Sequence, residues 1–360
     1  MKKVDLKDLG LNESYIEESK NYDEGLFLGR VSVQHRNMYN IITENGEIKA
    51  EVSGKFKYEV TDLEGFPAVG DWVLVDRDND INGNAIIHHL LKRKSFFKRK
   101  VSGDRTDSQV VGANIDTIFI CMSLNNDFNL RRLERYIAVA FDSMATPVIV
   151  LTKSDLCDNI DEKLIEINNV AIGIEIIVTS SVSEDGYNEI KSYLKKGKTI
   201  ALIGSSGVGK STMINKLLGE EKIKTNEISE NDKGKHTTTY RQLFLVETGG
   251  VLIDTPGMRE LGLIGADIEK SFVDIEELVL KCKFSDCRHE NEKGCAVREA
   301  IENGTLTEER LRNYKKLQRE LIYNELSSSK ALEREKIINM FGSMSNMKQL
   351  TRHIKNKKRY

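Results

Sequence analysis

The sequence predicts a chain of three parts: a small β-barrel, a three-layer α/β domain and a helical C-terminal segment that contains a cysteine cluster. Short β-rich runs follow one another without helices over residues 26–91, and strand and helix signals alternate over residues 115–253. Three of the five cysteines lie between residues 282 and 295. From these patterns we expect domains at residues 1–100, 101–265 and 266–360.

The composition predicts a soluble protein, because 39% of the 360 residues are hydrophobic and can form real cores. No apolar run approaches the roughly 18 residues of a membrane span, and the N-terminal residues lack the apolar stretch of a signal peptide. The cysteines are too few and too unevenly placed for a secreted disulfide framework. The net charge of −2 means that nucleic-acid binding depends on local basic patches. We therefore expect a cytoplasmic protein without a membrane partner.

The N-terminal part is expected to be an OB-fold barrel preceded by an arm. Residues 1–24 are polar, which predicts a loosely held arm. The expected strands are Leu26–Val33, Met38–Thr43, Ile48–Val52, Phe56–Val60, Val69–Val75 and Ala85–Leu91. Five or six short strands in so small a segment indicate a closed barrel, of which the OB-fold is a common nucleic-acid-binding type. An SH3-like barrel would give much the same pattern.

A basic segment with two aromatic residues, Lys92–Lys100, follows the barrel. Its six basic residues flank Phe96 and Phe97. Basic groups suit a phosphate backbone and aromatic rings suit stacked bases, so one interpretation is a site for single-stranded nucleic acid. The alternative is a solvated linker whose two phenylalanines pack on the barrel. Residues 101–109 are expected to be a flexible polar connection.

The central part is predicted to be a largely parallel sheet with helices on both faces. The expected strands are Ile115–Met122, Val148–Leu151, Glu175–Val178, Thr199–Ile203, Gln242–Glu247 and Val251–Ile253. The expected helices are Leu130–Met144, Asp161–Asn169, Tyr187–Lys195 and Ser211–Leu218. In such folds ligands bind at the carboxyl ends of the strands.

A phosphate-binding loop, GSSGVGKS, joins a predicted strand to a predicted helix at residues 204–211. Its glycines let backbone N–H groups surround a phosphate, and the helix start adds a positive dipole end. Lys210 is expected to reach the β- and γ-phosphates, and Ser211 to bind Mg²⁺. The residues expected to contact the nucleotide are Gly204, Ser205, Ser206, Gly207, Val208, Gly209, Lys210, Ser211 and Thr212.

A guanine-reading motif, TKSD, follows the strand at residues 148–151. It resembles the N-K-x-D signature of GTPases, with Thr152 in place of asparagine. The Asp155 carboxylate can accept from the N1 and N2 hydrogens of guanine, which adenine lacks, and the Lys153 stem can cover the ring. Ser154 completes the motif, and Ser180 lies after the next strand, where small residues support the base. A polar strand-to-helix turn is the alternative interpretation.

The TKSD motif and Ser180 both precede the phosphate loop, which reverses the usual order in GTPases. The domain is therefore predicted to be circularly permuted, with the same strands side by side but with different chain ends. The DTPG motif, which begins at Asp254, lies about 50 residues after the phosphate loop. We expect Asp254 to hold the water shell of Mg²⁺ and the Gly257 N–H to bond to the γ-phosphate. The segment after Gly257, which is expected to respond to the γ-phosphate, leads directly into the C-terminal part.

The segment between the two phosphate motifs reads GKHTTT, residues 234–239. We expect a threonine here, Thr238 or Thr239, to bind Mg²⁺ in the triphosphate state. Met258 follows DTPG where many GTPases carry a glutamine that orients the attacking water. Hydrolysis is therefore expected to be slow alone unless another group positions water. His236 and Lys210 are the two catalytic candidates. The alternative for His236 is a loop histidine that contacts solvent or a partner.

A predicted zinc site lies beyond the α/β domain. Cys282, Cys287, His289 and Cys295 supply three thiolates and an imidazole, the donor set of a closed structural zinc site. Helices are expected on either side, at Ile268–Leu280 and Leu306–Phe341. The tail Met347–Tyr360 is basic, which suits an RNA contact or a solvated tail.

Together these motifs resemble the bacterial ribosome small-subunit-dependent GTPase A family, over about residues 25–340. The resemblance implies an OB-fold, a permuted GTPase domain and a zinc domain, with a hydrophobic residue such as Met258 in place of the catalytic glutamine. It also implies that the chain binds the rRNA of the small ribosomal subunit late in maturation and that the subunit stimulates GTP hydrolysis. Lys235, where the family more often has arginine, and a divergent barrel are departures. We expect a monomer.

Two other functions fit parts of this sequence. A nucleotide-gated RNA-binding scaffold with little turnover would agree with Met258. A P-loop ATPase would agree with the phosphate loop alone, but Asp155 argues against it. Phosphate release with and without small subunits separates the first from an active GTPase, and competition of GTP against ATP separates the second.

Overall fold

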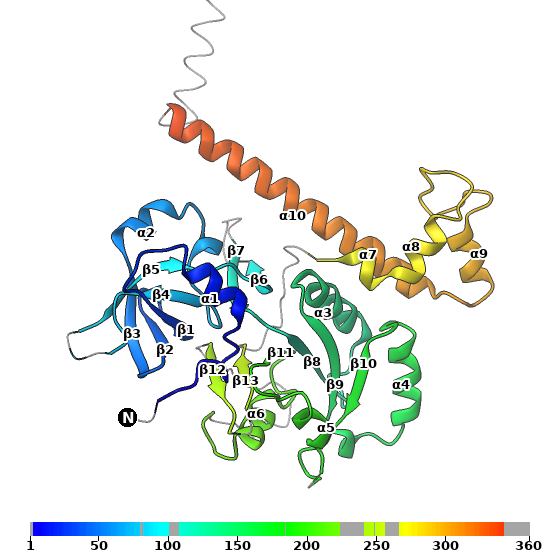
Figure 1. Ribbon diagram of the computed structural model, residues 1–360. Coiled ribbons are helices and arrows are strands. Elements are labelled where there is room, and N and C mark those ends of the chain that lie inside the picture. Colours follow the sequence, from blue (N-terminus) through cyan, green and yellow to red (C-terminus); the bar gives the residue numbers. More distant parts are fainter. Residues whose placement is uncertain are drawn as a thin grey trace, which may run out of the picture.

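The computed structural model describes residues 3–79, 81, 83–100, 108–183, 185–223, 241–247, 249–255 and 266–341. These residues form a barrel, an α/β domain and a helical C-terminal region, so the expected three-part fold class is confirmed (Figure 1). No described helix is both long enough and apolar enough to cross a membrane.

The N-terminal barrel has five strands in OB-fold order. They are β1 (Phe27–Gln34), β2 (Tyr39–Thr43), β3 (Gly46–Val52), β4 (Trp72–Val75) and β5 (Ala85–Leu90). The strands pair in the order β1-β2-β3-β5-β4, and β4 pairs back with β1 to close the barrel. The core is apolar, with Val31, Ile41 and Ile87 fully buried. This closure leaves few free strand edges within the barrel.

The stretch Phe56–Val60 is helical, so the prediction of a strand there was wrong. It lies in and just after α2 (Gly54–Glu59). The Ser53 hydroxyl accepts a hydrogen bond from the Phe56 N–H at 3.0 Å and caps the helix. Only Phe56 of this helix is buried. The Ser53 cap and the burial of Phe56 therefore favour a helix here, although several residues of this stretch are typical of strands.

The N-terminal arm is packed, which corrects the expectation of a loosely held segment. Leu6, Leu9 and Tyr15 are buried, and α1 (Glu13–Ser19) begins at the Asn12 cap. The Tyr15 hydroxyl donates to Asn114 at 2.9 Å. The buried Arg30 guanidinium donates to the Leu9 carbonyl and, at 2.9 Å, to Thr199. The arm is thus held where barrel and α/β domain meet, by contacts distant in sequence.

The central sheet has six strands in the order β10-β9-β8-β11-β13-β12. Their bounds are β8 (Thr117–Ser123), β9 (Thr146–Thr152), β10 (Glu175–Val178), β11 (Thr199–Ile203), β12 (Gln242–Leu245) and β13 (Val251–Asp254). All neighbours are parallel except β12, which runs antiparallel to β13. The pair Val33 and Gln242 continues this sheet into β1 of the barrel. The barrel therefore joins the sheet beside the phosphate-binding strands.

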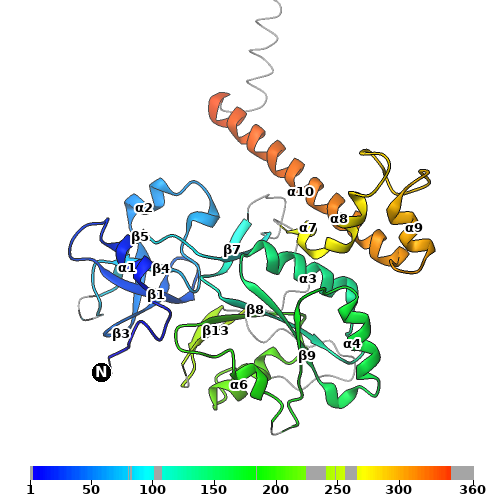
Figure 2. The ribbon, with the colours of Figure 1, turned by 45° about the vertical axis from the view of Figure 1, so that its right-hand side comes forward.

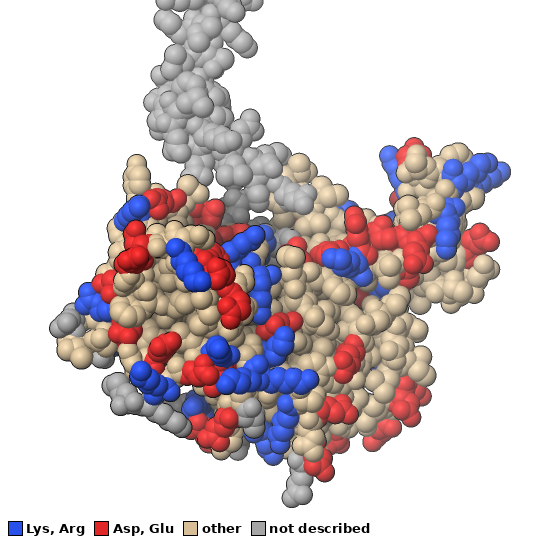
Figure 3. Space-filling view, in the orientation of Figure 1, with Lys and Arg blue, Asp and Glu red and all other residues tan. Residues whose placement is uncertain are grey.

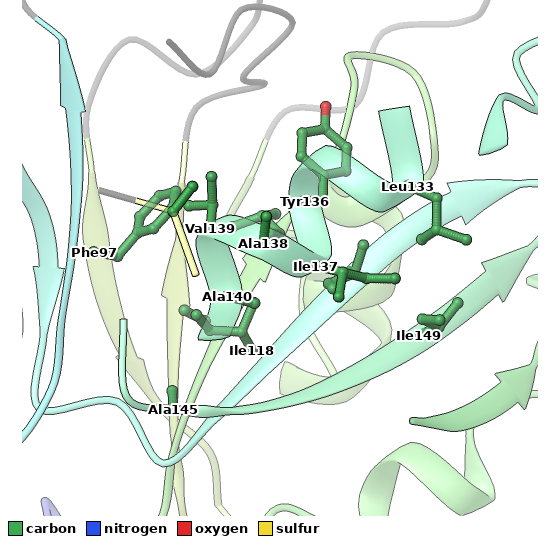
Figure 4. Close-up of a cluster of buried hydrophobic side chains, with 14 of the residues drawn as sticks. Phe97, Ile118, Leu133, Tyr136, Ile137, Ala138, Val139, Ala140, Ala145 and Ile149 are labelled. Carbon is green, nitrogen blue, oxygen red and sulfur yellow. The ribbon is translucent and has the colours of Figure 1, made fainter. Parts of the chain in front are cut away.

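Helices cover both faces of the sheet. They are α3 (Leu130–Asp142), α4 (Ile160–Asn168), α5 (Asn188–Lys191) and α6 (Lys210–Leu218), with a short turn at Ser154–Leu156. Alternate β8 residues point to opposite sides: Ile118 and Ile120 pack with α3, and Phe119 packs with the helices of the other face. Figure 4 shows the α3 side of this core, including Leu133, Ile137 and Ile149.

The end of the basic segment forms β6 (Phe96–Lys100), which pairs antiparallel with β7 (Ser108–Ala113). Of the polar connection expected at residues 101–109, the described residues 108 and 109 begin β7, so that expectation was wrong for them. Phe97 is 1% exposed and packs among α3 side chains such as Val139 (Figure 4), so it cannot stack on a base. Arg93 is paired with the buried Asp71 at 2.7 Å, and Lys94 with Asp116 at 2.9 Å. The interpretation of Phe97 as a stacking residue was wrong, because the two-residue period of the strand directs it into the core.

The C-terminal region consists of α7 (Ile268–Ser271), α8 (Val273–Val279), α9 (Ala296–Glu302) and α10 (Glu308–Phe341). The single helix expected at Ile268–Leu280 is broken at Phe272, whose buried ring packs near Tyr314 of α10. Helix α9 was not expected. Figure 2 shows α10 leading away from the cysteine-containing end of this region toward the barrel side. On the face in Figure 3, acidic and basic side chains of the described residues are intermixed.

Candidate GTP site and metal centre

The phosphate loop is shaped by glycines with positive φ. Gly204 follows β11 with a φ of 150°, and Gly207 and Gly209 have φ values of 82° and 100°. A Cβ atom on Gly204 would lie 2.4 Å from the Cys121 carbonyl oxygen of the neighbouring strand β8. Only glycine fits this close approach. The loop is therefore positioned by the buried sheet directly beneath it.

Lys210 begins α6 and is buried inside the loop. Its ammonium donates to the carbonyls of Gly204 at 2.9 Å and Ser205 at 2.8 Å. Burial lowers the pKa of this ammonium. Because Gly209 is the N-cap residue, no side chain caps α6 and its first N–H groups face the loop. The arrangement is that of an anion site at a helix start.

The two guanine-motif segments lie side by side at the carboxyl ends of β9 and β10. Lys153 has a left-handed backbone with a φ of 57°, and Asp155 follows in an exposed turn. The Ser180 hydroxyl donates to the Asp155 carboxylate, and the Ser154 N–H donates to the Thr179 carbonyl at 3.2 Å. Segments separated by 25 residues therefore form one surface, with a carboxylate oriented by a hydroxyl.

Thr152 links the guanine motif to the phosphate loop. Its hydroxyl donates to the carbonyl of Val208 at 2.5 Å, and its side chain is buried. Ser206 is half-buried and Gly207 is exposed, and Ser211 and Thr212 are half-buried at the start of α6. A threonine in place of asparagine thus still bridges the two halves of the site.

Asp254 ends β13 next to the phosphate loop and is 2% exposed. Burial raises the pKa of this carboxyl to about 6, and the nearby Lys210 partly opposes that shift. Its Oδ2 atom is buried and has no hydrogen-bond partner among the described residues. A buried oxygen without a partner beside a phosphate loop fits the water shell of a divalent cation.

Four predicted residues, His236, Thr238, Thr239 and Gly257, lie outside the described residues, as does Met258. Their roles stay predictions. One residue that sequence reasoning missed is Asp127, whose carboxylate accepts a hydrogen bond from the Ser205 hydroxyl of the phosphate loop. Its position after β8, the strand beside β11, was the available signal, because polar residues at neighbouring strand ends meet at one edge.

The metal-ligating candidates Cys282, Cys287, His289 and Cys295 come together, with their donor atoms all within 4.8 Å of one another. The Cys282 and Cys295 sulfurs are 3.9 Å apart, and they lie 3.7 and 3.5 Å from Nδ1 of His289. A tetrahedral zinc with Zn–S of about 2.3 Å and Zn–N of about 2.0 Å requires separations of about 3.8 Å and about 3.5 Å. The donor set and its geometry thus fit a metal ion.

Neighbouring groups hold this cluster in place. The Cys295 sulfur accepts from the Arg298 N–H at 3.4 Å and so caps the start of α9. Lys315 of α10 donates to the carbonyls of Arg288 at 2.6 Å and His289 at 3.3 Å. The loop that carries the ligands is therefore attached to α10, the long helix of the region.

A guanine-type motif on two adjacent strands, followed along the chain by a phosphate loop and then by an acidic strand end, defines a circularly permuted P-loop GTPase. The comparisons with known proteins agree. A sequence model of the RsgA GTPase family matches residues 90–264. Relatives at 49% and 44% identity over most of the chain show that it belongs to the RsgA GTPase family, and it is a GTP hydrolase by class.

Relatives match over most of the chain. "Small ribosomal subunit biogenesis GTPase RsgA 2" of Lactiplantibacillus plantarum is 49% identical, covering 91% of this chain and 92% of the relative. "Small ribosomal subunit biogenesis GTPase RsgA 1" of Oceanobacillus iheyensis is 44% identical, covering 88% and 91%. The crystal structure of YjeQ from Thermotoga maritima is similar with a TM-score of 0.60 and 30% identity, covering 82% of this chain and 99% of that one.

Proposed function

We propose that this chain hydrolyses GTP to GDP and phosphate during late maturation of the small ribosomal subunit, and that binding to the subunit stimulates turnover. The observation that carries the proposal is the junction of the guanine motif with the phosphate loop, where the Thr152 hydroxyl donates to the Val208 carbonyl. The names of the relatives supply the ribosomal context.

Each half of the site has a defined role in this proposal. Asp155, oriented by the Ser180 hydroxyl, accepts from the N1 and N2 hydrogens of guanine, and the Lys153 stem covers the ring. The loop from Gly204 to Thr212 surrounds the phosphates. Lys210 exchanges its two carbonyl partners for β- and γ-phosphate oxygens, which are stronger acceptors because they are charged.

The proposed magnesium site uses Ser211 and Asp254. The Ser211 hydroxyl would bind Mg²⁺ directly, and Oδ2 of Asp254, which has no partner within the described part of the chain, would hold a water of its shell. Bound Mg²⁺ neutralises charge on the β- and γ-phosphates. Thr238 or Thr239 would complete the site, and the Gly257 N–H would bond to the γ-phosphate. Asp254 has to be ionised for this role, and the nearby Lys210 favours that form.

Hydrolysis by the chain alone is proposed to be slow. Met258 has a thioether where a glutamine commonly orients water, and a thioether cannot do this. We propose His236 as the group that positions water once the subunit is bound. His236→Ala should then lower stimulated turnover at unchanged GTP affinity, and His88→Ala on the barrel serves as the matched control. Unchanged turnover in both variants would remove His236 from the mechanism.

The Cys282, Cys287, His289 and Cys295 cluster is proposed to bind one structural zinc ion. Four protein donors leave no open position for a substrate, so the ion would stabilise the fold of this region. The proposed division is a barrel in residues 1–100, the GTPase domain in 101–265 and the zinc-binding domain in 266–360. We further propose that the protein acts as a cytoplasmic monomer whose barrel and zinc domain contact rRNA.

Phosphate release measured while purified small subunits are titrated tests the main proposal. We expect turnover to rise with small subunits and to stay at the basal rate with large subunits, which carry a similar excess of RNA phosphate. A flat response to small subunits would contradict it. GTP should bind in competition with GDP but not with ATP, and equal competition by ATP would contradict the assignment of the base site.

The alternative function is a nucleotide-gated RNA-binding scaffold with little turnover, and Met258 favours it. In that case small-subunit affinity would differ between the GTP and GDP forms, while phosphate release would stay basal at saturating subunits. The two functions therefore give opposite results in the same titration.

A further inference from the structure

We propose that Asp127 and Glu134, at the start of α3, are positioning residues that couple the zinc-binding region to the phosphate loop. This inference rests on the proposed stimulation by the subunit. It concerns how a contact made at the C-terminal region reaches the nucleotide, and neither residue belongs to a motif recognised in the sequence.

The first contact joins α3 to the phosphate loop. The Asp127 carboxylate accepts from the Ser205 hydroxyl, and the Arg132 guanidinium holds the same carboxylate at 2.8 Å. Arg132 also donates to the Asp127 carbonyl. Asn129 caps α3 by accepting from the Arg132 N–H at 3.0 Å. The first turn of α3 therefore determines where the Asp127 carboxylate lies relative to the loop.

The second contact joins α3 to the C-terminal region at Glu134, seven residues after Asp127. The Glu134 side chain is fully buried and accepts from Arg310 at 2.8 Å and from Asn313, both on α10. Arg310 also pairs with Asp274 of α8 at 2.6 Å. The Arg310 and Glu134 side chains are 4% and 0% exposed, so their pair is shielded from water. Asp274 is 25% exposed, and Arg131 of α3, which contacts both Glu134 carboxylate oxygens at 2.9 Å, is 36% exposed.

A buried ion pair resists separation, because removing one partner leaves a buried charge without compensation. A displacement of α10 is therefore expected to carry α3 with it instead of breaking the Glu134 contacts. Arg135 of α3 also donates two hydrogen bonds to Glu320 of α10, each 2.7 Å long, which strengthens the contact between the two helices. Helix α3 is thus a rigid element with the zinc-binding region at one side and the phosphate loop at its start.

The same chain of contacts extends to the metal ligands. Lys315, one turn beyond Arg310 on α10, donates to the carbonyl of His289. The route from the metal loop through α10 and α3 to Ser205 thus consists of hydrogen bonds and ion pairs between described residues. A route of contacts becomes coupling only when perturbing it changes the distant site, which the following variants test.

Glu134→Gln removes the buried charge at nearly constant volume and leaves Arg310 its pair with Asp274. We expect basal turnover to stay within about twofold of wild type and subunit-stimulated turnover to fall about tenfold, within the range typical of coupling between sites. Subunit affinity and metal content should stay unchanged. The matched control is Glu308→Gln, which removes the Arg298 pair between α9 and α10 without touching α3. It should leave the stimulation unchanged.

The double variant Asp127→Asn/Glu134→Gln tests whether both residues act on one route. If they do, stimulated turnover in the double variant is no lower than in the single variant that has the lower stimulated turnover. Multiplied losses would contradict a shared route. Loss of subunit affinity in parallel with stimulation in Glu134→Gln would also overturn the proposal, since the residue would then act in docking alone.

Amide hydrogen exchange of residues 204–209 gives a readout without ribosomal subunits. In the full-length chain, Glu134→Gln should increase exchange in this loop, and Glu308→Gln should not. If wild type shows no stimulation, the proposed function fails while this comparison still tests the coupling. If wild type is stimulated and both exchange and stimulation are unchanged in Glu134→Gln, the coupling fails and the proposed function stands.

Discussion

The phosphate loop lies at the edge of a sheet that is buried on both faces, whereas the metal cluster lies in a segment with almost no apolar core. Every residue of β11 is buried, and so are its neighbours Cys121 and Asp254. Among residues 281–295, all of which the structure describes, only His289 and Cys295 are buried, and both are candidate ligands. The loop can hold its shape through packing, and the segment with the four candidate ligands is expected to need a bound metal for stability.

The largest expected effect concerns the Cys282, Cys287, His289 and Cys295 cluster. Cys282→Ser removes one of four ligands, and metal content should fall from about one ion per chain to near zero, because the segment has little other stabilisation. Metal analysis and thermal unfolding measure this. Cys157→Ser, outside the cluster, is the control. Retention of metal and of the unfolding profile in Cys282→Ser would show that the segment folds on its own packing.

The matching change in the loop is Gly204→Ala. Its Cβ would meet the Cys121 carbonyl at 2.4 Å, so the loop has to shift at a cost of about 3 kcal/mol. We expect GTP affinity to fall about 100-fold in a fluorescent-nucleotide titration. Gly207→Ala, where a Cβ meets open space, should have a smaller effect from φ strain alone. Equal losses would mean that the sheet does not determine the loop geometry.

The guanine half of the site is open to water, so its substitution should have an intermediate effect. Asp155→Asn loses a charged acceptor for two guanine hydrogens, worth about 2 kcal/mol, and GTP affinity should fall about 30-fold. Xanthosine triphosphate, which has a carbonyl in place of the 2-amino group, should bind more tightly to Asp155→Asn than to wild type. Competition binding measures both. Unchanged discrimination between the two nucleotides would place the base elsewhere.

The smallest expected effect is the pH dependence of Mg²⁺-dependent nucleotide binding. The pKa of Asp254 is about 6, above its unfolded value, so its carboxyl contributes stability below about pH 4 that is lost as the pH rises through 6. Mg²⁺ binding has the opposite dependence, because it needs the ionised form. Affinity at pH 5.5 should be about fourfold weaker than at pH 7. A pH response that persists in Asp254→Asn would have another source.

Much of the fold could be predicted because the signals were local. The strands Glu175–Val178 and Thr199–Ile203 have the predicted bounds, since each is a short apolar run between turn residues. The failures occurred where distant contacts or a local cap decided the conformation. The Ser53 cap makes α2 a helix, and burial against α3 removes Phe97 from any nucleic-acid interface.

The candidate site divides in the same way. Motif spacing predicted the phosphate loop, the guanine motif and the four candidate metal ligands, because glycine, lysine, aspartate and cysteine at those intervals suit only a few chemistries. Asp127 and Glu134 have no such pattern. Their partners lie 78 and 176 residues away, at Ser205 and Arg310, so no motif identifies these contacts, and the position of Asp127 after β8 was the one available signal.

The sequence by itself determined the chemistry of this protein: which residues can surround a phosphate, read a guanine or ligate a metal, and in which order they occur. These are properties of residue type and spacing. The tertiary structure decided which of them meet, how the N-terminal arm is held by Arg30, and how α3 lies between the loop and the C-terminal region. Such contacts arise from packing between elements far apart in the chain, which residue patterns along it do not encode.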